Sequence, residues 1–218
     1  MPKGTLLGWH FTVGRKLAYN DNRHIRAGST LVHRGRLVPC QAGLHMSERA
    51  IDALRYANGV LVWRVEGSGE MVPHDVPVAK HCCRRRKALW CVNAKELLAR
   101  FARSCALDVL HLWSAPDVVR RWLTTGDEAL YSEGRDAAYW ASAPLSGRDD
   151  VYAAKATQAC THARVVKQAF MAARWAMDAT GAIDRTRAKQ NARLESWLRK
   201  AHAGTFDAAA PLRARRHA

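Results

Sequence analysis

The segment from Cys40 to Glu70 constrains the fold of this chain most, because its local signals all point to one strand-helix-strand unit. A turn at Gly43 leads into a short strand. Ser47 is a good helix N-cap, and apolar residues recur at helical spacing over residues 47–57 until Asn58-Gly59 ends the helix. Residues 60–66 then alternate as a strand that exposes two usable faces. A unit of this kind can build a site, but it does not name a reaction.

The remaining N-terminal residues favour short strands separated by turns. Strands are expected over residues 6–13, 29–32 and 36–40. Residues 67–69 (Gly-Ser-Gly) should turn the chain. Residues 71–92 contain two prolines and a basic cluster, so they are expected to form a loop that ends in a short strand at 88–92. Residues 1–92 are therefore predicted to form a small β-rich domain with one helix.

The hydrophobic period changes at Asn93, where a capping-box pattern starts a helix. Further helices are expected over residues 114–126, 127–143, 149–180 and from Gly181 to about Ala203. Small alanine side chains between residues 137 and 182 favour close helix packing. The predicted fold class is α+β: a β-rich domain (1–92), a mostly helical Ala-rich region (93–205) and a basic, disordered tail (206–218).

The composition indicates a folded chain. Of its 218 residues 48% are hydrophobic, and eight are Trp. We find neither an apolar run of the roughly 18–20 residues that a membrane helix needs nor an export signal, so the chain is expected in the cytoplasm, without membrane contact. The six cysteines are then expected to be reduced, and Cys105 and Cys160 fall on apolar helix faces.

The net charge of +16 is unevenly distributed. Residues 1–100 carry 17 Lys and Arg against 7 Asp and Glu, residues 101–150 carry 5 against 8, and residues 151–218 carry 13 against 4. Basic segments of this kind favour a polyanionic partner, because phosphate neutralisation releases counterions. Solubility, or docking of basic onto acidic segments of the same molecule, explains the pattern equally well.

The basic residues most suited to a phosphate backbone form a run near residue 85 and a stripe on the last helix: Lys80, Arg84, Arg85, Arg86, Lys87, Arg187, Lys189 and Arg193. No helix-turn-helix, zinc-finger or RNA-recognition pattern accompanies them. Contact with nucleic acid would therefore be directed at the backbone, with little base readout.

Several cysteines and histidines could in principle bind a metal: Cys40, His45, His74, His81, Cys82, Cys83 and Cys91. Zinc prefers four such ligands, usually supplied by paired C-x2-4-C knuckles. The spacing here fails that pattern, and no metal site is predicted.

Several short motifs resemble a family of uncharacterised bacterial and phage proteins: Gly8-Trp9-His10-Phe11, Gly43-Leu44-His45, Ala53-Leu54-Arg55-Tyr56-Ala57, Arg86-Lys87-Ala88-Leu89-Trp90 and Ala106-Leu107-Asp108-Val109-Leu110-His111-Leu112-Trp113. In that family a small N-terminal domain of unknown function precedes an Ala-rich helical region. The resemblance implies this architecture and a phage or mobile-element setting, and it implies no activity.

The strand-helix-strand unit also resembles part of an ADP-ribosyltransferase fold. Under that reading His10 would hold the nicotinamide ribose of NAD, and His45 or Ser47 would line the pocket. The acid that stabilises the ribosyl cation would have to be Glu66 or Glu70. The competing interpretation makes both histidines structural and Ser47 a helix cap, since motif matches without the full geometry are weak.

The leading hypothesis is a phage- or mobile-element-associated basic protein that contacts a nucleic-acid backbone or an acidic protein without a cofactor. One alternative is an NAD-using enzyme with its cleft near His10 and His45. Another is a structural or virion protein that forms oligomers and binds no ligand. The sequence leaves open whether the chain is an enzyme.

Overall fold

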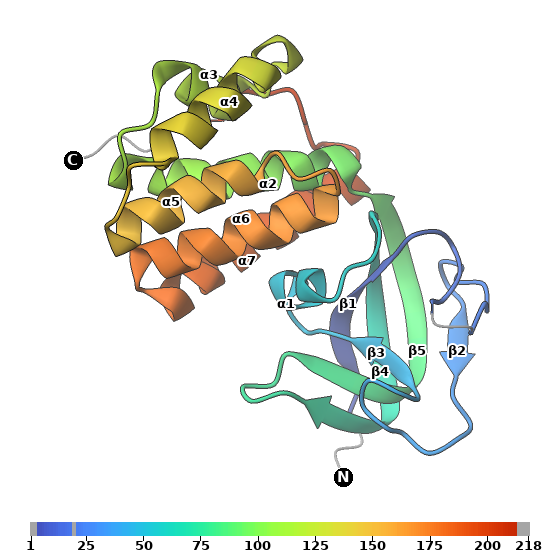
Figure 1. Cartoon of the computed structure of the whole chain (residues 1–218). Coiled ribbons are helices and arrows are strands. Elements are labelled where there is room, and N and C mark those ends of the chain that lie inside the picture. Colours follow the sequence, from blue (N-terminus) through green and yellow to red (C-terminus); the bar gives the residue numbers. More distant parts are fainter. Residues whose placement is uncertain (1–3, 19–20, 213–218) are drawn as a thin grey trace. The chain divides into compact units, whose positions relative to one another are not determined.

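The chain divides into two compact units in the computed structural model, which describes residues 4–18 and 21–212. The sheet unit comprises residues 1–94 and 194–205, and the helical unit comprises residues 95–193 and 206–218. An antiparallel sheet from N-terminal strands and a helical C-terminal half confirm the α+β class (Figure 1). The sequence placed residues 194–205 in the helical region, whereas here they belong to the sheet unit. No helix in the described part of the chain is long and apolar enough to cross a membrane.

Five antiparallel strands form the sheet: β1 (Leu6–Thr12), β2 (Thr30–Val32), β3 (Leu44–Met46), β4 (Leu61–His74) and β5 (Lys80–Asn93). β4 lies between β1 and β5, and β5 also pairs with β2 and β3. Beyond β3, the Trp9 amide donates to the Ser47 carbonyl (2.7 Å) and the Ser47 amide donates to the Trp9 carbonyl (3.1 Å). Strands β1, β4, β5 and β3 are therefore linked in a closed ring of backbone pairings.

One face of this ring encloses an apolar cluster. Its buried members come from β3, β4 and β5 and from the segment before β2: Leu17, Ile25, Leu44, Met46, Trp63, Val65, Cys83 and Ala88. A Cβ at Gly8 or Gly67 would lie 2.8 Å from the Met46 side chain. Glycine at both positions therefore leaves the space that Met46 fills.

The opposite face of β1 carries Trp9, which α1 (Ala50–Arg55) and the end of α7 (Ile183–His202) help to cover. Trp9 Nε1 and the Ala50 amide both donate to Glu195 Oε1, at 3.2 and 3.3 Å. Leu194 and Leu198 of α7 are fully buried in the same unit. The last turns of α7 thus complete the core of the sheet unit.

The expected turn at residues 67–69 and the loop after it are wrong. β4 continues to His74, and β5 begins at Lys80, so the two strands form one long hairpin. The pairing register shifts between Ser68 and Met71, and Gly69, which has a positive φ of 77°, lies in this irregularity. The glycines that suggest a turn therefore form a bulge, which bends a strand without ending it.

The strand expected over residues 36–40 and the helix expected over residues 47–57 differ in the structure. Residues 36–40 form no strand, and only Val38 makes an isolated bridge, to Ala42. The helix expected over residues 47–57 is shorter, Ala50–Arg55, and is preceded by Arg49. Ser47 does not cap it, because its backbone is committed to the bridge with Trp9.

The helical unit consists of α2 (Lys95–Val109), α3 (Asp117–Thr125), α4 (Tyr131–Ser142), α5 (Arg148–Ala159), α6 (Val165–Thr180) and the first part of α7, with 3-10 turns at Leu110–Leu112 and Glu128–Leu130. The single helix expected over residues 149–180 is two helices. Cys105 and Cys160 are buried, as expected. Alanines of α5 and α6 are buried where these helices pack on each other and on α2.

Part of the expected disordered tail packs onto the helical unit. Arg100 donates to the carbonyls of Ala208 (3.2 Å) and Ala210, and the Leu212 amide donates to the Thr124 carbonyl (2.9 Å). The tail cations Arg213, Arg215 and Arg216 lie outside the described residues.

Candidate functional site

The basic run of residues 80–87 lies on β5, where the pleat divides it between two faces. Lys80 and Arg86 are buried, whereas Arg85 and Lys87 are exposed. A loop would have let all these cations follow a phosphate backbone together. The strand leaves only part of the run available to a partner.

Arg84 is occupied within the sheet unit. Its guanidinium donates to Glu70 and to the backbone carbonyls of His33 (3.2 Å) and Gly35. The His33 amide in turn donates to the Arg84 carbonyl at 2.9 Å. Arg84 therefore fastens the segment after β2 to β5, and in this role it is a structural residue.

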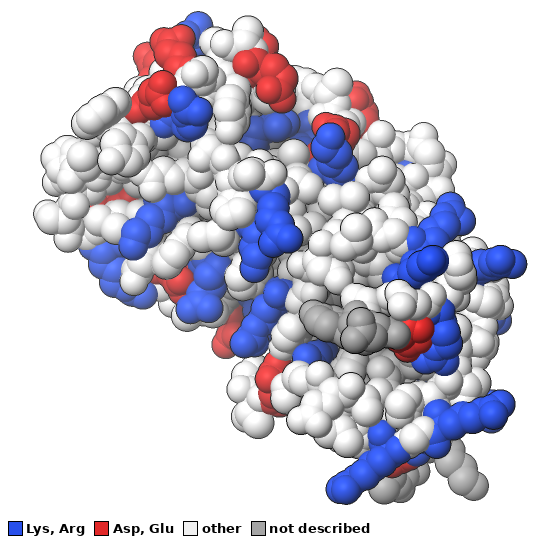
Figure 2. Space-filling model, turned by 45° about the vertical axis from the view of Figure 1, so that its right-hand side comes forward, with Lys and Arg blue, Asp and Glu red and all other residues white. Residues whose placement is uncertain are grey.

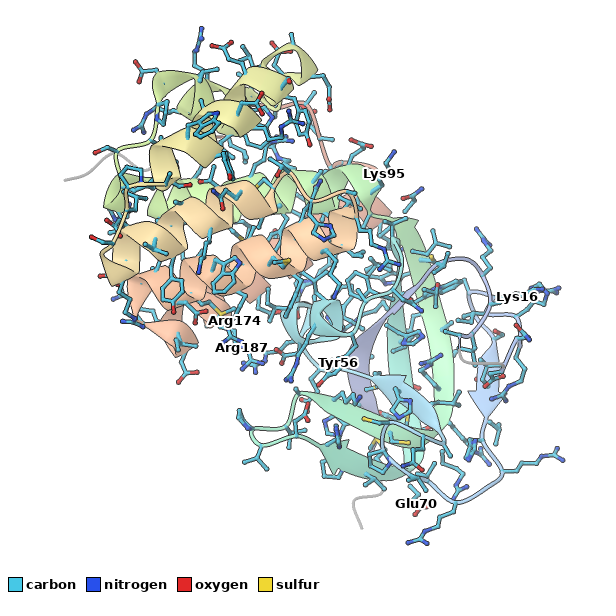
Figure 3. The ribbon with its side chains drawn as sticks, in the orientation of Figure 1. Lys16, Tyr56, Glu70, Lys95, Arg174 and Arg187 are labelled. Carbon is cyan, nitrogen blue, oxygen red and sulfur yellow. The ribbon has the colours of Figure 1, made fainter. Side chains whose placement is uncertain are left out.

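The candidate cations of α7 also have partners within the helical unit. Arg193 makes two hydrogen bonds to the Asp108 carboxylate, at 2.8 and 3.0 Å, and one to Ser104 Oγ at 2.9 Å. Lys189 Nζ lies 3.9 Å from the same carboxylate. Arg187 is partly exposed on the same helix (Figure 3). Arg193 is thus used to hold α7 to α2.

A different set of cations is exposed on the sheet unit. Their side chains make no ion pair or hydrogen bond with another residue that the structure describes: Arg15, Lys16, Arg26, Arg34, Arg36, Arg85 and Lys87. They come from the segment between β1 and β3 and from β5. β2 pairs with β5, so that Thr30 lies opposite Lys87 and Val32 lies opposite Arg85. Figure 2 shows Lys and Arg side chains projecting from the right-hand side of the molecule, and Figure 3 shows Lys16 at its edge.

Most carboxylates of the sheet unit are paired with other residues. Asp21 binds Arg23 at 2.5 Å, Asp52 binds Arg49 at 2.7 Å, and Glu70 binds Arg84. Glu48 lies 2.8 Å from His81 Nε2. Glu66 sits opposite Lys87 in the β4–β5 register without an ion pair to it. The exposed cations therefore retain most of their charge for an external partner.

His10 lies opposite Trp63 on the face of the apolar cluster, whereas His45 alternates with Leu44 and Met46 of that cluster and points to the other face. Burial lowers the pKa of His10 well below its ordinary value, and the charges of Arg86 and His45 lower it further. Burial, then Lys80 and Arg86, lowers the pKa of His45 to about 4. Both imidazoles are therefore neutral at neutral pH. The Cys40 amide donates to His45 Nε2 at 3.1 Å, which requires an unprotonated nitrogen there.

Arg86 is an unusual residue that sequence reasoning grouped with the surface cations. It is 3% exposed, and it donates through one nitrogen to the His45 carbonyl. Its other terminal nitrogen is buried with no hydrogen-bond partner among the described residues. Burial lowers the pKa of this guanidinium to about 10. A buried cation with a free donor can attract an anionic group.

The acid that an ADP-ribosyltransferase site needs does not join His10 in the described structure. Glu66 alternates with the buried Val65 and Gly67, so it points away from the face that carries His10. Glu70 is bound to Arg84. Ser47 is buried at 2% exposure. The geometry thus places His10 and His45 on opposite faces of the ring, and neither candidate acid joins His10.

Metal ligation finds no support in the described part of the chain, where no three His, Cys, Asp or Glu side chains are grouped to hold an ion. All six cysteines are free thiols. No protein-family model, curated protein or solved structure matches this chain. The family resemblance of the sequence motifs therefore stays a prediction.

Proposed function

We propose that this protein binds a nucleic-acid backbone through the exposed cations of its sheet unit. The observation that carries the proposal is a set of seven exposed Lys and Arg side chains, between β1 and β3 and on β5, without an ion-pair partner among the described residues, on a unit whose carboxylates are mostly paired internally. Such charges attract phosphates without any sequence-specific fold. A phage or mobile-element setting, suggested by the family resemblance, is compatible with this role.

The arrangement favours contact with phosphates over base readout. The cations lie on β5 and on irregular segments around β2, and Arg84 fixes residues 33–35 beside β5 through its hydrogen bonds. This places Arg34 and Arg36 in the segment that borders Arg85. A row of cations on a folded edge can follow a strand of phosphates, whereas none of the described helices offers the pattern of a groove-reading motif.

The test measures binding of the full chain to a labelled duplex, a labelled single strand and polyglutamate. We expect both nucleic acids to bind, with little dependence on sequence, and Arg34→Glu/Arg85→Glu to weaken both. The matched control is Arg120→Glu/Arg121→Glu, which reverses two exposed cations of α3 in the helical unit. Binding to polyglutamate alone would point to an acidic protein partner and overturn the proposal. Equal effects of the two double variants would overturn the assignment of the surface.

A second candidate function is an NAD-using activity near His10 and His45. The observation that favours it is the buried Arg86, whose unpartnered nitrogen could meet one phosphate of a dinucleotide beside His10. Incubation with labelled NAD would then show hydrolysis or transfer that His10→Ala abolishes. Absence of both, together with no change in thermal stability on adding NAD, would dismiss it.

A further inference from the structure

A cluster of reactive side chains surrounds the sulfur of Cys40, outside the basic surface. Cys40 is exposed, and its Sγ lies 3.0 Å from Lys80 Nζ and 3.3 Å from His74 Nε2. His74 ends β4 and Lys80 begins β5, and the two face each other across the hairpin. A nucleophile, an imidazole and an ammonium therefore meet at one point of the sheet unit.

Two further residues hold this arrangement in place. Asp75 Oδ1 lies 3.1 Å from His74 Nε2, and the Tyr56 hydroxyl donates to the other oxygen of Asp75. Lys80 Nζ lies 4.1 Å from the centre of the Tyr56 ring, which attracts the ammonium. Tyr56, at the end of α1, is labelled in Figure 3. The cluster thus holds a nucleophile within reach of an imidazole and an ammonium, with a carboxylate and a phenol packed beside them.

The hydrogen-bond directions show the role of the sulfur. The pKa of Asp75 is lowered, chiefly by the hydrogen bond that it accepts from Tyr56. This carboxylate is therefore ionised and can only accept hydrogen bonds. His74 Nε2 lies 3.3 Å from Cys40 Sγ and 3.1 Å from the Asp75 carboxylate, so the ring contacts both groups. The Lys80 ammonium has only donors to offer. Cys40 Sγ therefore accepts a hydrogen bond from the Lys80 ammonium and lies beside the His74 ring.

The backbone at Cys40 is also specialised. Its φ is +66°, in the left-handed region that side chains other than glycine rarely adopt. The Cys40 amide donates to His45 Nε2, a bond that the low pKa of His45 preserves at neutral pH. Strain of this kind is typical of functional positions held by their surroundings. Here it presents the sulfur to His74 and Lys80.

The other five cysteines differ from Cys40. Cys82, Cys83, Cys105 and Cys160 are buried, and burial raises the pKa of each thiol, to about 12 for Cys83 and Cys160. Burial also raises the pKa of the partly exposed Cys91 to about 11. These thiols stay protonated and shielded in the native protein, so an added electrophile meets Cys40 first.

We propose that Cys40 is a modification site that undergoes thiol-disulfide exchange with small disulfides. The Cys40 thiolate attacks one sulfur of the disulfide, a new S–S bond forms, and the other half leaves as a thiolate. The small disulfide is the oxidant, so no further co-reactant is needed. Lys80 and His74 hold the attacking thiolate, and Asp75 and Tyr56 position them.

The test treats the native full chain with the aromatic disulfide 5,5′-dithiobis(2-nitrobenzoic acid) and follows release of the coloured thiolate. We expect one rapid equivalent, mapped to Cys40 by peptide mass and absent in Cys40→Ser, with the other thiols reacting only after denaturation. Lys80→Met and His74→Gln should each lower the rate constant about tenfold. His81→Gln is the control, because it changes a histidine of the same hairpin that contacts Glu48 instead.

A second measurement needs no variant. The rate constant for Cys40 in the native protein should exceed that of glutathione at the same pH. A Cys40 rate constant no larger than that of glutathione at the same pH would overturn the proposal. So would equal rates in wild-type, Lys80→Met and His74→Gln proteins whose circular dichroism matches.

Discussion

Replacing Gly59 with alanine should loosen the start of β4, because the glycine lies directly against the end of β1. A Cβ at this position would lie 2.3 Å from Val13 Cα, 2.4 Å from the Thr12 carbonyl oxygen and 2.5 Å from the Val13 nitrogen. All three are backbone atoms, so no side chain can rotate away. Relief requires the Thr12–Leu61 pairing at the end of the β1–β4 ladder to separate.

The cost follows from what that separation breaks. Forcing a methyl group into packed structure costs about 1–3 kcal/mol, and each backbone hydrogen bond lost adds about 1 kcal/mol. The Thr12 hydroxyl also accepts a buried hydrogen bond from Trp63 Nε1 (2.9 Å), which links this end of β1 to the core. We expect Gly59→Ala to lower the free energy of unfolding of the sheet unit by about 2–4 kcal/mol.

Gly14→Ala is the matched control in the same unit. A Cβ at Gly14 would have no neighbour within 4 Å. Gly14→Ala therefore reduces the entropy of the unfolded chain as Gly59→Ala does, but it creates no steric overlap in the folded protein. Native-state amide hydrogen exchange of β1 and β4 reports the sheet unit separately from the helical unit. A difference between the two variants below about 1 kcal/mol would refute the overlap argument.

Three further predictions concern other parts of the sheet unit. Arg86→Met removes a buried guanidinium with an unpartnered nitrogen. Denaturant unfolding should therefore show unchanged stability or a gain of about 1–2 kcal/mol, and nucleic-acid binding should not change. A loss of stability above about 2 kcal/mol would show that the surrounding residues stabilise the charged guanidinium. The pKa values of His10 and His45 are lowered on folding, so the unfolded chain takes up protons first as pH falls from about 6.5 to about 4. The free energy of unfolding should therefore fall over that window, and less steeply in His45→Gln. A free energy of unfolding that does not change over this window would contradict the burial of these rings. Leu198→Ala in α7 should lower the hydrogen-exchange protection of β1 and β4 by about 3 kcal/mol, whereas the exposed Lys200→Ala should lower it by less than about 0.5 kcal/mol. Equal effects of the two variants would show that α7 does not stabilise the sheet unit.

Local patterns predicted much of the fold. The capping pattern at Asn93 and the glycines Gly126 and Gly181 give the limits of α2, α3 and α6 within a few residues, because periodicity and left-handed caps are local signals. The β4–β5 hairpin was missed, because Gly69 and Pro73 in β4 and Pro77 in the tip look like strand breakers. Pairing across the hairpin outweighs those local preferences.

The site residues were harder to predict for a related reason. A run of cations is visible in a sequence, but whether Arg85 and Arg86 face solvent or core depends on strand register. The joining of Cys40, His74 and Lys80 depends on the same hairpin. The attachment of Leu194–Thr205 to the sheet unit is a contact between distant segments, and one amphipathic helix does not reveal which unit it completes.

The salt dependence of nucleic-acid affinity tests the central proposal most directly. If Arg34 and Arg85 each neutralise one phosphate of a duplex, the slope of log affinity against log salt concentration should become shallower by about two units in Arg34→Glu/Arg85→Glu. The slope of Arg120→Glu/Arg121→Glu, which carries the same net charge, should match the wild-type slope. A wild-type affinity that does not change with salt, or equal slopes for the two double variants, would contradict the proposal.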